Sequence, residues 1–293
     1  MDARLQRRVQ RYGWDKAAAS YEQYWARQLK EPQDRVLALA DLREGEHVLD
    51  VACGTGLVAF QAAERVGPGG RVVGTDISEA MVDRIRAAAR ERGLSQVTAE
   101  RCDAEELGLG AATFDVVLCA LGLMYVTDPG RALDQMHHVL RAGGRAVVAV
   151  WGARAHCGWA ELFPIVERQV ASEVCPLFFQ LGNGESLHYA LTGARFTDIE
   201  VERIATTLSY DSDESACGAA FAAGPVALPY SRFDQATRDV VHREYLESIA
   251  PYRQGTGYQI PGEFVIARAV KQDDIETSAP DGSGEPPSAH PPG

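Results

Sequence analysis

The sequence predicts an α/β fold built on a seven-stranded, mostly parallel sheet with an antiparallel last strand and helical cap insertions. Two observations support this prediction. Apolar runs rich in β-branched residues alternate with segments of helical periodicity, which is typical of a parallel sheet covered on both faces. The chain of 293 residues is also long enough for one large α/β domain with insertions.

The predicted elements follow one another from residue 47 to residue 270. The expected strands are His47–Val51, Arg71–Asp76, Val97–Cys102, Phe114–Ala120, Arg145–Trp151, Phe196–Tyr210 and Gly262–Val270. The expected helices are Leu57–Val66, a helix capped by Ser78 and ended by Gly93, Asp128–Leu140, Gly158–Ala171, Glu185–Leu191 and most of Asp211–Ala250.

Composition and charge exclude several classes of protein. A net charge of -12 disfavours a nucleic-acid substrate, because such a surface repels phosphates. The basic N-terminus has no apolar core typical of a signal peptide, and no apolar run is long enough to span a membrane. The six cysteines form no CxxC pair, so we expect no metal site and reduced thiols. These features predict a soluble, cytoplasmic protein.

A glycine turn after the first strand predicts a cofactor site. In VLDVACGTG, Val48 to Gly56, a strand opens into a turn at a helix N-terminus, where a ligand can approach the backbone. Asp76 ends the next strand and is placed to bind the two hydroxyls of a ribose. The same glycines also fit a dinucleotide pattern, but Asp50 would repel a pyrophosphate. S-adenosylmethionine (SAM) has no phosphate and carries an ammonium and a sulfonium, so a carboxylate there is favourable.

The stretch from Val48 to Trp151 resembles the class I SAM-dependent methyltransferases, which have a Rossmann-like fold. It is most similar to the C-methyltransferases of ubiquinone and menaquinone biosynthesis. The similar segments occur in the expected order: VLDVACGTG, VVGTDISEAM, CDAEEL, FDVVLCALGLMYVTD and ALDQMHHVLRAGGRAVV. Three positions depart from the pattern: Ala52 replaces the first glycine, Ala142 a proline, and Ala120 a polar residue. The region after Trp151 does not follow the quinone enzymes.

The resemblance implies a role for each matching residue. The methionine part of SAM would be lined by Asp50, Ala52, Gly54, Thr55 and Gly56, with Ala120 beside it. Asp76 would hold the ribose, Ile77 and Met81 would flank the adenine, and Asp103 and Ala104 would bind its edge. Tyr21 resembles an aromatic residue that closes over the cofactor.

Residues for the methyl acceptor are predicted outside these motifs, because loops carry substrate recognition on a rigid scaffold. The candidates are Tyr12, Trp14, Trp151, Tyr230 and Phe233. Packing of a small helical subdomain would explain the residues after Tyr210 equally well. His156 follows the fifth strand and is a candidate general base, although loop polarity is a simpler explanation. His137 and His138 are expected on the solvent face of their helix.

The sequence therefore predicts a SAM-dependent methyltransferase that acts on an oxygen, nitrogen or carbon of a small apolar or aromatic metabolite. Two alternatives stay open: a protein of this fold that binds SAM without methyl transfer, and an NAD-dependent oxidoreductase. The expected organisation is an N-terminal helical lid (1–45), a SAM-binding core (46–152), and the rest of the catalytic domain (153–271) with a substrate cap at about 211–258. A tail (272–293) rich in Pro, Gly, Ser and acidic residues is expected to be disordered.

Overall fold

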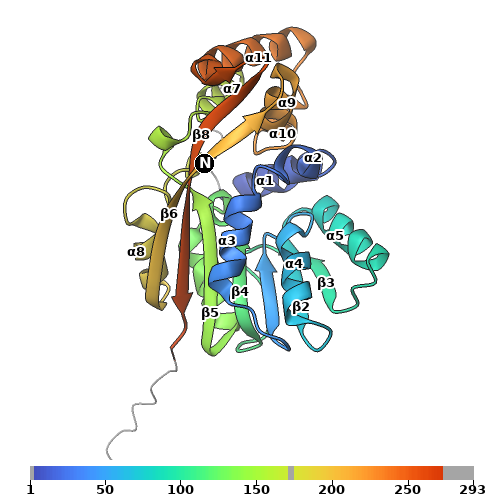
Figure 1. The fold of residues 1–293 in the computed structure, drawn as a ribbon, viewed down its shortest axis with the longest axis vertical. Coiled ribbons are helices and arrows are strands. Elements are labelled where there is room, and N and C mark those ends of the chain that lie inside the picture. Colours follow the sequence, from blue (N-terminus) through green and yellow to red (C-terminus); the bar gives the residue numbers. More distant parts are fainter. Residues whose placement is uncertain (1–2, 171–174, 273–293) are drawn as a thin grey trace, which may run out of the picture.

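A computed structural model describes residues 3–170 and 175–272 of the chain. The predicted disorder of the tail concerns residues that lie almost entirely outside this range. The centre of the molecule is one twisted sheet whose strands follow the order β3-β2-β1-β4-β5-β8-β6 (Figure 1). The strands are β1 (His47–Val51), β2 (Arg71–Asp76), β3 (Val97–Arg101), β4 (Phe114–Ala120), β5 (Leu140–Trp151), β6 (Thr197–Tyr210) and β8 (Gly257–Val270).

The sheet confirms the predicted mixed topology. Strands β3, β2, β1, β4 and β5 pair in parallel, whereas β8 runs antiparallel to both β5 and β6. A two-residue strand, β7 (Arg253–Gln254), pairs with the start of β8. Strand β8 begins at Gly257 rather than at the expected Gly262, because residues 257–261 continue the pairing with the end of β6.

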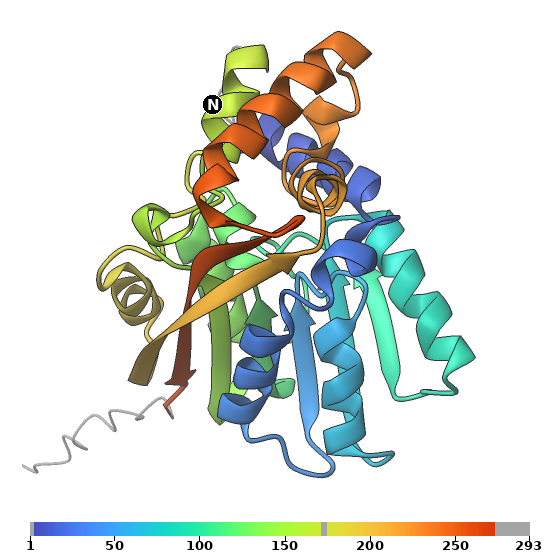
Figure 2. The same cartoon turned by 45° about the horizontal axis from the view of Figure 1, so that its top comes forward.

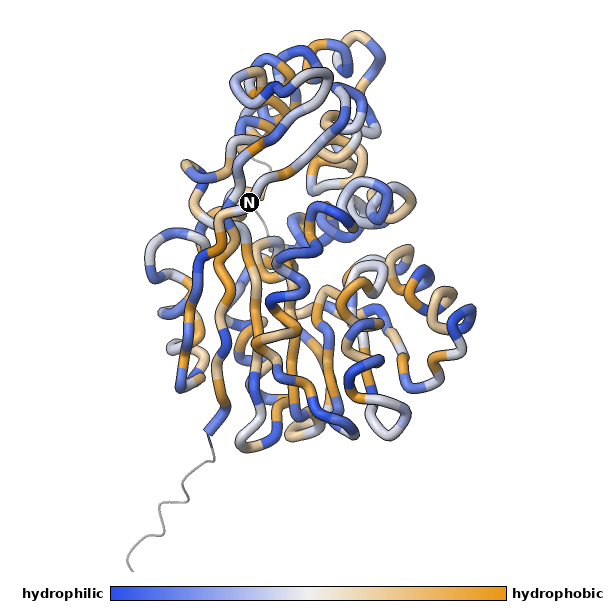
Figure 3. Tube along the Cα trace, in the orientation of Figure 1, coloured by the Kyte–Doolittle hydropathy of each residue, from blue (hydrophilic) through white to orange (hydrophobic). Residues whose placement is uncertain are grey.

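Helices cover both faces of the sheet. One face carries α3 (Lys30–Ala40), α4 (Leu57–Val66) and α5 (Glu79–Glu91), and the other carries α6 (Pro129–Val139) and α8 (Ser186–Gly193). The hydropathy colouring places the apolar residues along the central strands, where the core lies (Figure 3). His138 is exposed as expected, but His137 is buried with its ring centroid 5.1 Å from that of Phe196. The expectation for His137 was wrong because α6 packs against α8 and the turn that follows it.

Beyond the carboxyl ends of the parallel strands, a second group of helices lies over the edge of the sheet (Figures 1 and 2). It contains α1 (Ala3–Ala17), α2 (Tyr21–Trp25) and α7 (Leu162–Val170). Residues between β6 and β8 add α9 (Asp213–Cys217), a π-helical turn η3 (Gly218–Ala222), α10 (Ala227–Tyr230), α11 (Gln235–Ile249) and a 3-10 turn η4 (Ala250–Tyr252). Two further 3-10 turns, η1 (Leu123–Tyr125) and η2 (Arg154–His156), follow β4 and β5.

Two findings bear on the predictions from composition. Among the described helices, none is both long and apolar enough to cross a membrane. All six cysteines are described and carry free thiols, and the described residues contain no cluster of metal-ligating side chains.

Candidate cofactor and substrate site

A cavity lies between the carboxyl edge of the sheet and the helices above it. It encloses about 1210 Å³ outside the protein atoms, including the part open to solvent. Its lining follows the sheet edge from β2 and β3, where Asp76 and Asp103 lie, past Ala120 of β4 to Trp151 of β5 and Tyr210 of β6. The carboxyl edge of such a sheet is where open α/β folds bind their ligands.

The cavity has two chemically different ends. We call the part near β1, β2 and β3 the cofactor end; it is lined by Arg7, Gln10, Trp14, Tyr21, Ala52, Gly54, Asp76, Ile77, Met81, Cys102, Asp103, Ala104, Glu105, Ala120, Leu121, Gly122, Tyr125 and Val126. We call the other part the aromatic lobe; it is lined by Trp25, Leu29, Trp151, Trp159, Leu162, Phe178, Tyr210 and Tyr245. Ala220, Gly224 and Pro225 complete the wall of the cavity.

The glycine turn is held in place by the carboxylate of Asp76. The backbone N–H of Gly54 donates to Oδ2 of Asp76 at 2.9 Å, and that of Ser78 donates to Oδ1 at 2.9 Å. Gly56 has φ +95, and a Cβ there would lie 2.8 Å from side-chain atoms of Ile85 and Phe60. Glycine is therefore required at position 56 both by the backbone and by the space available.

Ala52, which stands where the family pattern has glycine, adopts φ +56. This left-handed conformation is unfavourable for a residue with a Cβ. Space for the methyl group comes from Gly122 after β4, because a Cβ at Gly122 would lie only 2.3 Å from the Cβ of Ala52. The departure at position 52 is thus accommodated by a glycine far away in the sequence.

Two buried carboxylates lie under the turn. Asp50 is 1% exposed and Asp76 is 7% exposed, and Oδ2 of Asp50 has no hydrogen-bond partner among the described residues. Burial, and then the charge of Asp76, raise the pKa of Asp50 to about 8. Burial also raises the pKa of Asp76 to about 6, against the backbone hydrogen bonds from Ser78 and Gly54. This pair favours a cationic ligand and disfavours a phosphate.

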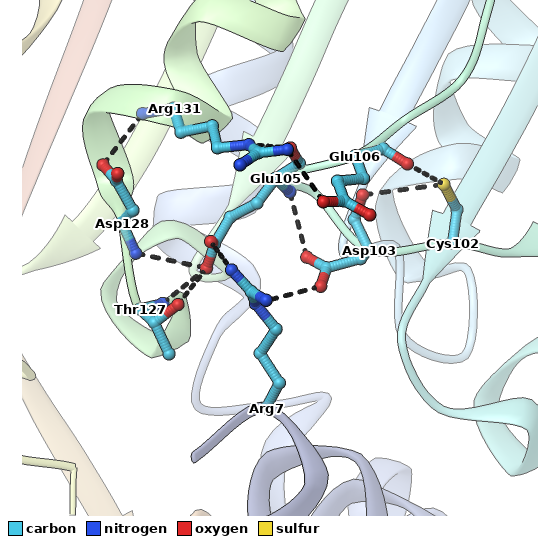
Figure 4. Close-up of polar contacts among 8 residues, drawn as sticks. All are labelled: Arg7, Cys102, Asp103, Glu105, Glu106, Thr127, Asp128 and Arg131. Atoms are coloured by element: carbon cyan, nitrogen blue, oxygen red, sulfur yellow. Dashed lines mark hydrogen bonds and ion pairs between the residues drawn. The ribbon is translucent and has the colours of Figure 1, made fainter. Parts of the chain in front are cut away.

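Arg7 of α1 connects the N-terminal helix to Asp103 and Glu105 at the cofactor end (Figure 4). Its Nε lies 3.3 Å from Oδ2 of Asp103, and its Nη2 donates to Oε2 of Glu105 at 2.6 Å. The other oxygen of Glu105 accepts from the N–H of Thr127 at 2.8 Å and from that of Asp128 at 3.1 Å. Burial opposes the charge on Glu105, but the hydrogen bonds from Arg7 and Thr127 outweigh it and lower the pKa of this carboxyl.

The same helix is attached a second time near its C-terminus. Oδ1 of Asp15 accepts from the hydroxyl of Ser78 at 2.6 Å and from the N–H of Ala80 at 3.2 Å, at the start of α5. A negative charge is favourable at a helix N-terminus. The ring of Tyr21, just beyond α1, lies over the glycine turn, 3.9 Å from where a Cβ of Gly54 would be.

A chain of aromatic contacts joins the two ends of the cavity. It starts at Tyr21 and Trp14, whose ring centroids are 6.0 Å apart, and continues through Tyr125, 4.9 Å from Trp14. Phe178 lies 5.4 Å from Tyr125, and Trp159 lies 5.6 Å from Phe178. The cavity is therefore continuous along one aromatic wall.

Most residues predicted for the cofactor do line the cavity: Tyr21, Ala52, Gly54, Asp76, Ile77, Met81, Asp103, Ala104 and Ala120. Asp50, Thr55 and Gly56 lie behind this lining. Asp50 and Thr55 are buried, and each has a side-chain oxygen without a partner among the described residues.

The residues predicted for the acceptor are divided. Trp14 and Trp151 line the cavity, whereas Tyr12, Tyr230, Phe233 and His156 are not part of its lining. Tyr12 is 46% exposed. Tyr230 shares a hydrogen bond of 2.9 Å with His242, and both residues line a second, separate hollow. The side chain of His156 is 59% exposed, with Nδ1 3.0 Å from Oε1 of Glu263.

The structure adds residues that sequence reasoning missed. Arg7 and Gln10 share one face of α1 with the predicted Trp14, and their spacing of three and four residues was a usable signal for this. Trp159, Phe178 and Tyr245 had no such signal, because they come from separate segments and meet only in the folded chain.

Comparison with known proteins agrees with this geometry. Residues 42–176 match the family model described as "Methyltransferase domain". This segment, which is just under half of the chain, is therefore similar to methyltransferase domains. The chain is 39% identical over 132 residues to nocamycin O-methyltransferase of Saccharothrix syringae, covering 45% of this chain and 47% of that protein. It is 44% identical over 108 residues to the ubiquinone/menaquinone biosynthesis C-methyltransferase UbiE of Idiomarina loihiensis, covering 36% and 43%.

The methyltransferase domain thus has named methyltransferases as relatives, although the chain spans only about half the length of those two. A solved structure with a similar fold is phosphoethanolamine N-methyltransferase 2 of Haemonchus contortus, in complex with phosphomonomethylethanolamine and S-adenosylhomocysteine. It has a TM-score of 0.58 at 20% identity and covers 88% of this chain and 58% of that one. At this identity the likeness concerns the fold.

Proposed function

We propose that this protein transfers a methyl group from SAM to a small molecule, with SAM at the cofactor end and the acceptor in the aromatic lobe. The observation that carries the proposal is the pair of buried carboxylates, Asp50 and Asp76, beneath the glycine turn. SAM has the cationic groups that such a pair favours and lacks the phosphates that it would repel. The unpartnered Oδ2 of Asp50 and the raised pKa of both carboxyls fit a ligand of this charge.

The residues of the cofactor end suit the parts of SAM. A carboxylate has about four lone-pair sites, so Asp76 can accept from two ribose hydroxyls besides the N–H groups of Gly54 and Ser78. Asp103 keeps lone pairs for an adenine amino group while it accepts from Glu105 and pairs with Arg7. Ala52 and Gly54 leave the backbone open to the methionine part.

SAM supplies an electrophilic methyl group on its sulfonium, so the protein need only align the acceptor and exclude water. The aromatic lobe is suited to both tasks, because it joins the cofactor end where the ring of Phe178 contacts that of Tyr125 and is lined mostly by buried rings. His156 lies outside the lining, so this proposal gives it no part in the transfer.

We extend the proposal to the organisation of the chain. The N-terminal helices (1–45) and the insertion at about 211–258 would close the cavity, since both contribute to its wall through residues such as Trp25 and Ala220. We also propose a cytoplasmic location and no nucleic-acid partner, on the basis of the free cysteines and the net charge of -12.

The first experiment is calorimetric titration of the protein with SAM, S-adenosylhomocysteine and NADH. We expect binding of the first two and none of NADH; the reverse result would contradict the proposal. The second is incubation with methyl-labelled SAM and a small-molecule extract. Label in a small molecule supports methyl transfer, whereas tight SAM binding with no transfer to any fraction would favour a protein that only binds SAM.

A further inference from the structure

One side chain of the aromatic lobe has a polar group without a partner. Trp159 is 6% exposed and lines the cavity, and its indole N–H has no hydrogen-bond partner among the described residues. A buried donor left unpaired has lost its hydrogen bond to water without replacing it, which is unfavourable. Such a cost at the wall of a cavity is explained if a ligand supplies the acceptor.

The indole ring is held by its neighbours. Its centroid lies 4.9 Å from that of Trp151 and 5.6 Å from that of Phe178, both in edge-on geometry. Phe163 and Phe179 lie within 6.1 Å and 5.7 Å of the same ring. Because rings enclose Trp159 on several sides, its indole ring is held in one orientation.

The rest of the lobe is uncharged. The charged side chains of the cavity lining, among the residues that the structure describes, are Arg7, Asp76, Asp103 and Glu105, and all four belong to the cofactor end. Burial raises the pKa of Tyr210 and of Tyr245, so both phenols stay neutral. A charged ligand group would lose its hydration in this lobe without gaining a counterion, which is unfavourable.

We propose that Trp159 orients the methyl acceptor by donating its indole N–H to a neutral oxygen on a flat ring system that stacks in the aromatic lobe. This inference rests on the proposed function and adds the chemical class of the acceptor: an uncharged ring compound bearing a carbonyl, ether or hydroxyl oxygen. The hydrogen bond fixes which atom of the ring faces the cofactor end, so Trp159 is a specificity-determining residue.

The main rival is an amine bound as a cation by the aromatic rings, since such rings also attract ammonium groups. Two observations disfavour it. The N–H of Trp159 is a donor, and an ammonium offers only donors in return. No carboxylate among the described residues lines the lobe to balance the charge.

The test uses two probes of the same shape, 9-fluorenone and fluorene, which differ in one carbonyl. The chain has four tryptophans, so labelling with indole-15N-tryptophan gives four indole N–H signals in the NMR spectrum. Single Trp→Phe variants assign them. We expect the Trp159 signal to move downfield with 9-fluorenone and not with fluorene, because ring-current effects are shared and only the ketone accepts a hydrogen bond.

The affinities give a second readout. One neutral hydrogen bond contributes about 1 kcal/mol, so 9-fluorenone should bind about fivefold more tightly than fluorene. Trp159→Phe should abolish this difference and retain fluorene binding. Trp151→Phe removes a tryptophan from the same lobe and should preserve the preference for the ketone.

Several results would overturn the inference: equal affinity for the two probes, an unmoved Trp159 signal in the ketone complex, binding of neither probe, or tighter binding of tetramethylammonium. The wild-type spectra decide the matter even if Trp159→Phe fails to fold. Titrations with and without S-adenosylhomocysteine involve no methyl transfer, so a failure here is distinguishable from a failure of the proposed function, which the SAM titration tests.

Discussion

The two ends of the cavity are built in opposite ways. At the cofactor end, polar groups are fixed by hydrogen bonds between neighbouring loops, as at Asp76, which holds both Gly54 and Ser78. In the aromatic lobe, rings such as Trp151 and Trp159 are fixed by packing alone, and the one polar group described above has no partner. Under the two proposals above, cofactor binding depends on a few polar contacts, whereas acceptor binding depends mainly on shape and on the indole N–H of Trp159.

Asp76 should give the largest effect if the cofactor end depends on its polar contacts. Hydrogen bonds to a charged group contribute about 1.5–3 kcal/mol each, so loss of two ribose contacts in Asp76→Ala should weaken SAM binding at least about 100-fold. Asp76→Asn keeps one oxygen acceptor, so its affinity for SAM should lie between that of Asp76→Ala and that of the wild type. Calorimetry measures both affinities, and circular dichroism checks the fold. An unchanged affinity for SAM would contradict the assignment of Asp76 to the ribose.

The pH dependence of SAM binding tests the buried carboxylates. The pKa of Asp50, about 8, and that of Asp76, about 6, lie above the unfolded value of about 3.9. The folded chain therefore retains protons that the unfolded chain releases, so the stability of the ligand-free protein should fall as the pH rises from about 4 to about 8. A bound cation favours the ionised carboxylates, so SAM binding should release protons and tighten as the pH rises through this range.

Between about pH 6 and pH 7 we expect the ionisation of Asp50 to raise the affinity for SAM by up to about tenfold, because one group releases at most one proton. The amino group of SAM stays protonated in this window, since α-amino groups titrate near about 7.7. Calorimetry in buffers of different ionisation enthalpy measures the released protons. Asp50→Asn should make the affinity for SAM less dependent on pH. If the affinity of this variant changes with pH as steeply as that of the wild type, another group causes the pH dependence.

Arg7 tests the attachment of the lid helix to the cofactor end. Arg7→Gln leaves the buried Glu105 without its cation and frees one end of α1, so SAM should dissociate about fivefold faster. The effect is modest because Arg7 is partly exposed. Arg8→Gln removes the same charge from an exposed position of the same helix and should leave the rate unchanged. Stopped-flow displacement with S-adenosylhomocysteine measures both rates, and equal rates would argue against a lid held by Arg7.

Tyr230 and Phe233 should give the smallest effect on acceptor binding, since neither lines the cavity. Tyr230→Phe removes the hydrogen bond to His242 and should lower the free energy of unfolding by about 1 kcal/mol. Phe233→Ala should likewise act on stability. The affinity of each variant for 9-fluorenone should match that of the wild type. A several-fold loss of probe binding would show that the aromatic lobe extends into the insertion.

The cofactor end could be anticipated from the sequence because its residues lie next to one another within short segments. Asp76 can be identified because it ends an apolar strand, and Gly54 because it lies in a turn that continues into a helix. The mostly parallel direction of the strands followed from the alternation of elements for the same local reason, whereas their order in the sheet was not predicted. The spacing of three and four residues between Arg7, Gln10 and Trp14 also indicates that they share one face of α1.

The aromatic lobe could not be anticipated in this way. Trp25, Trp159 and Tyr245 come from α2, a turn before α7, and α11, and only the folding of these segments brings them to one cavity. Clustering of aromatic residues in the sequence around GPVALPY instead pointed to Tyr230 and Phe233, which pack against each other with ring centroids 6.2 Å apart. Local apolar density does not distinguish a cavity wall from the core of a small helical unit.

The shared space of Ala52 and Gly122 restricts how this chain can diverge. A methyl group stands at position 52, and a second one at position 122 would lie 2.3 Å from it. While position 52 carries alanine, a side chain at position 122 therefore requires the backbone of one of the two turns to move. The two positions are coupled, so in related sequences we expect a side chain at 122 to occur together with glycine at 52, a pairing that neither position reveals when viewed alone.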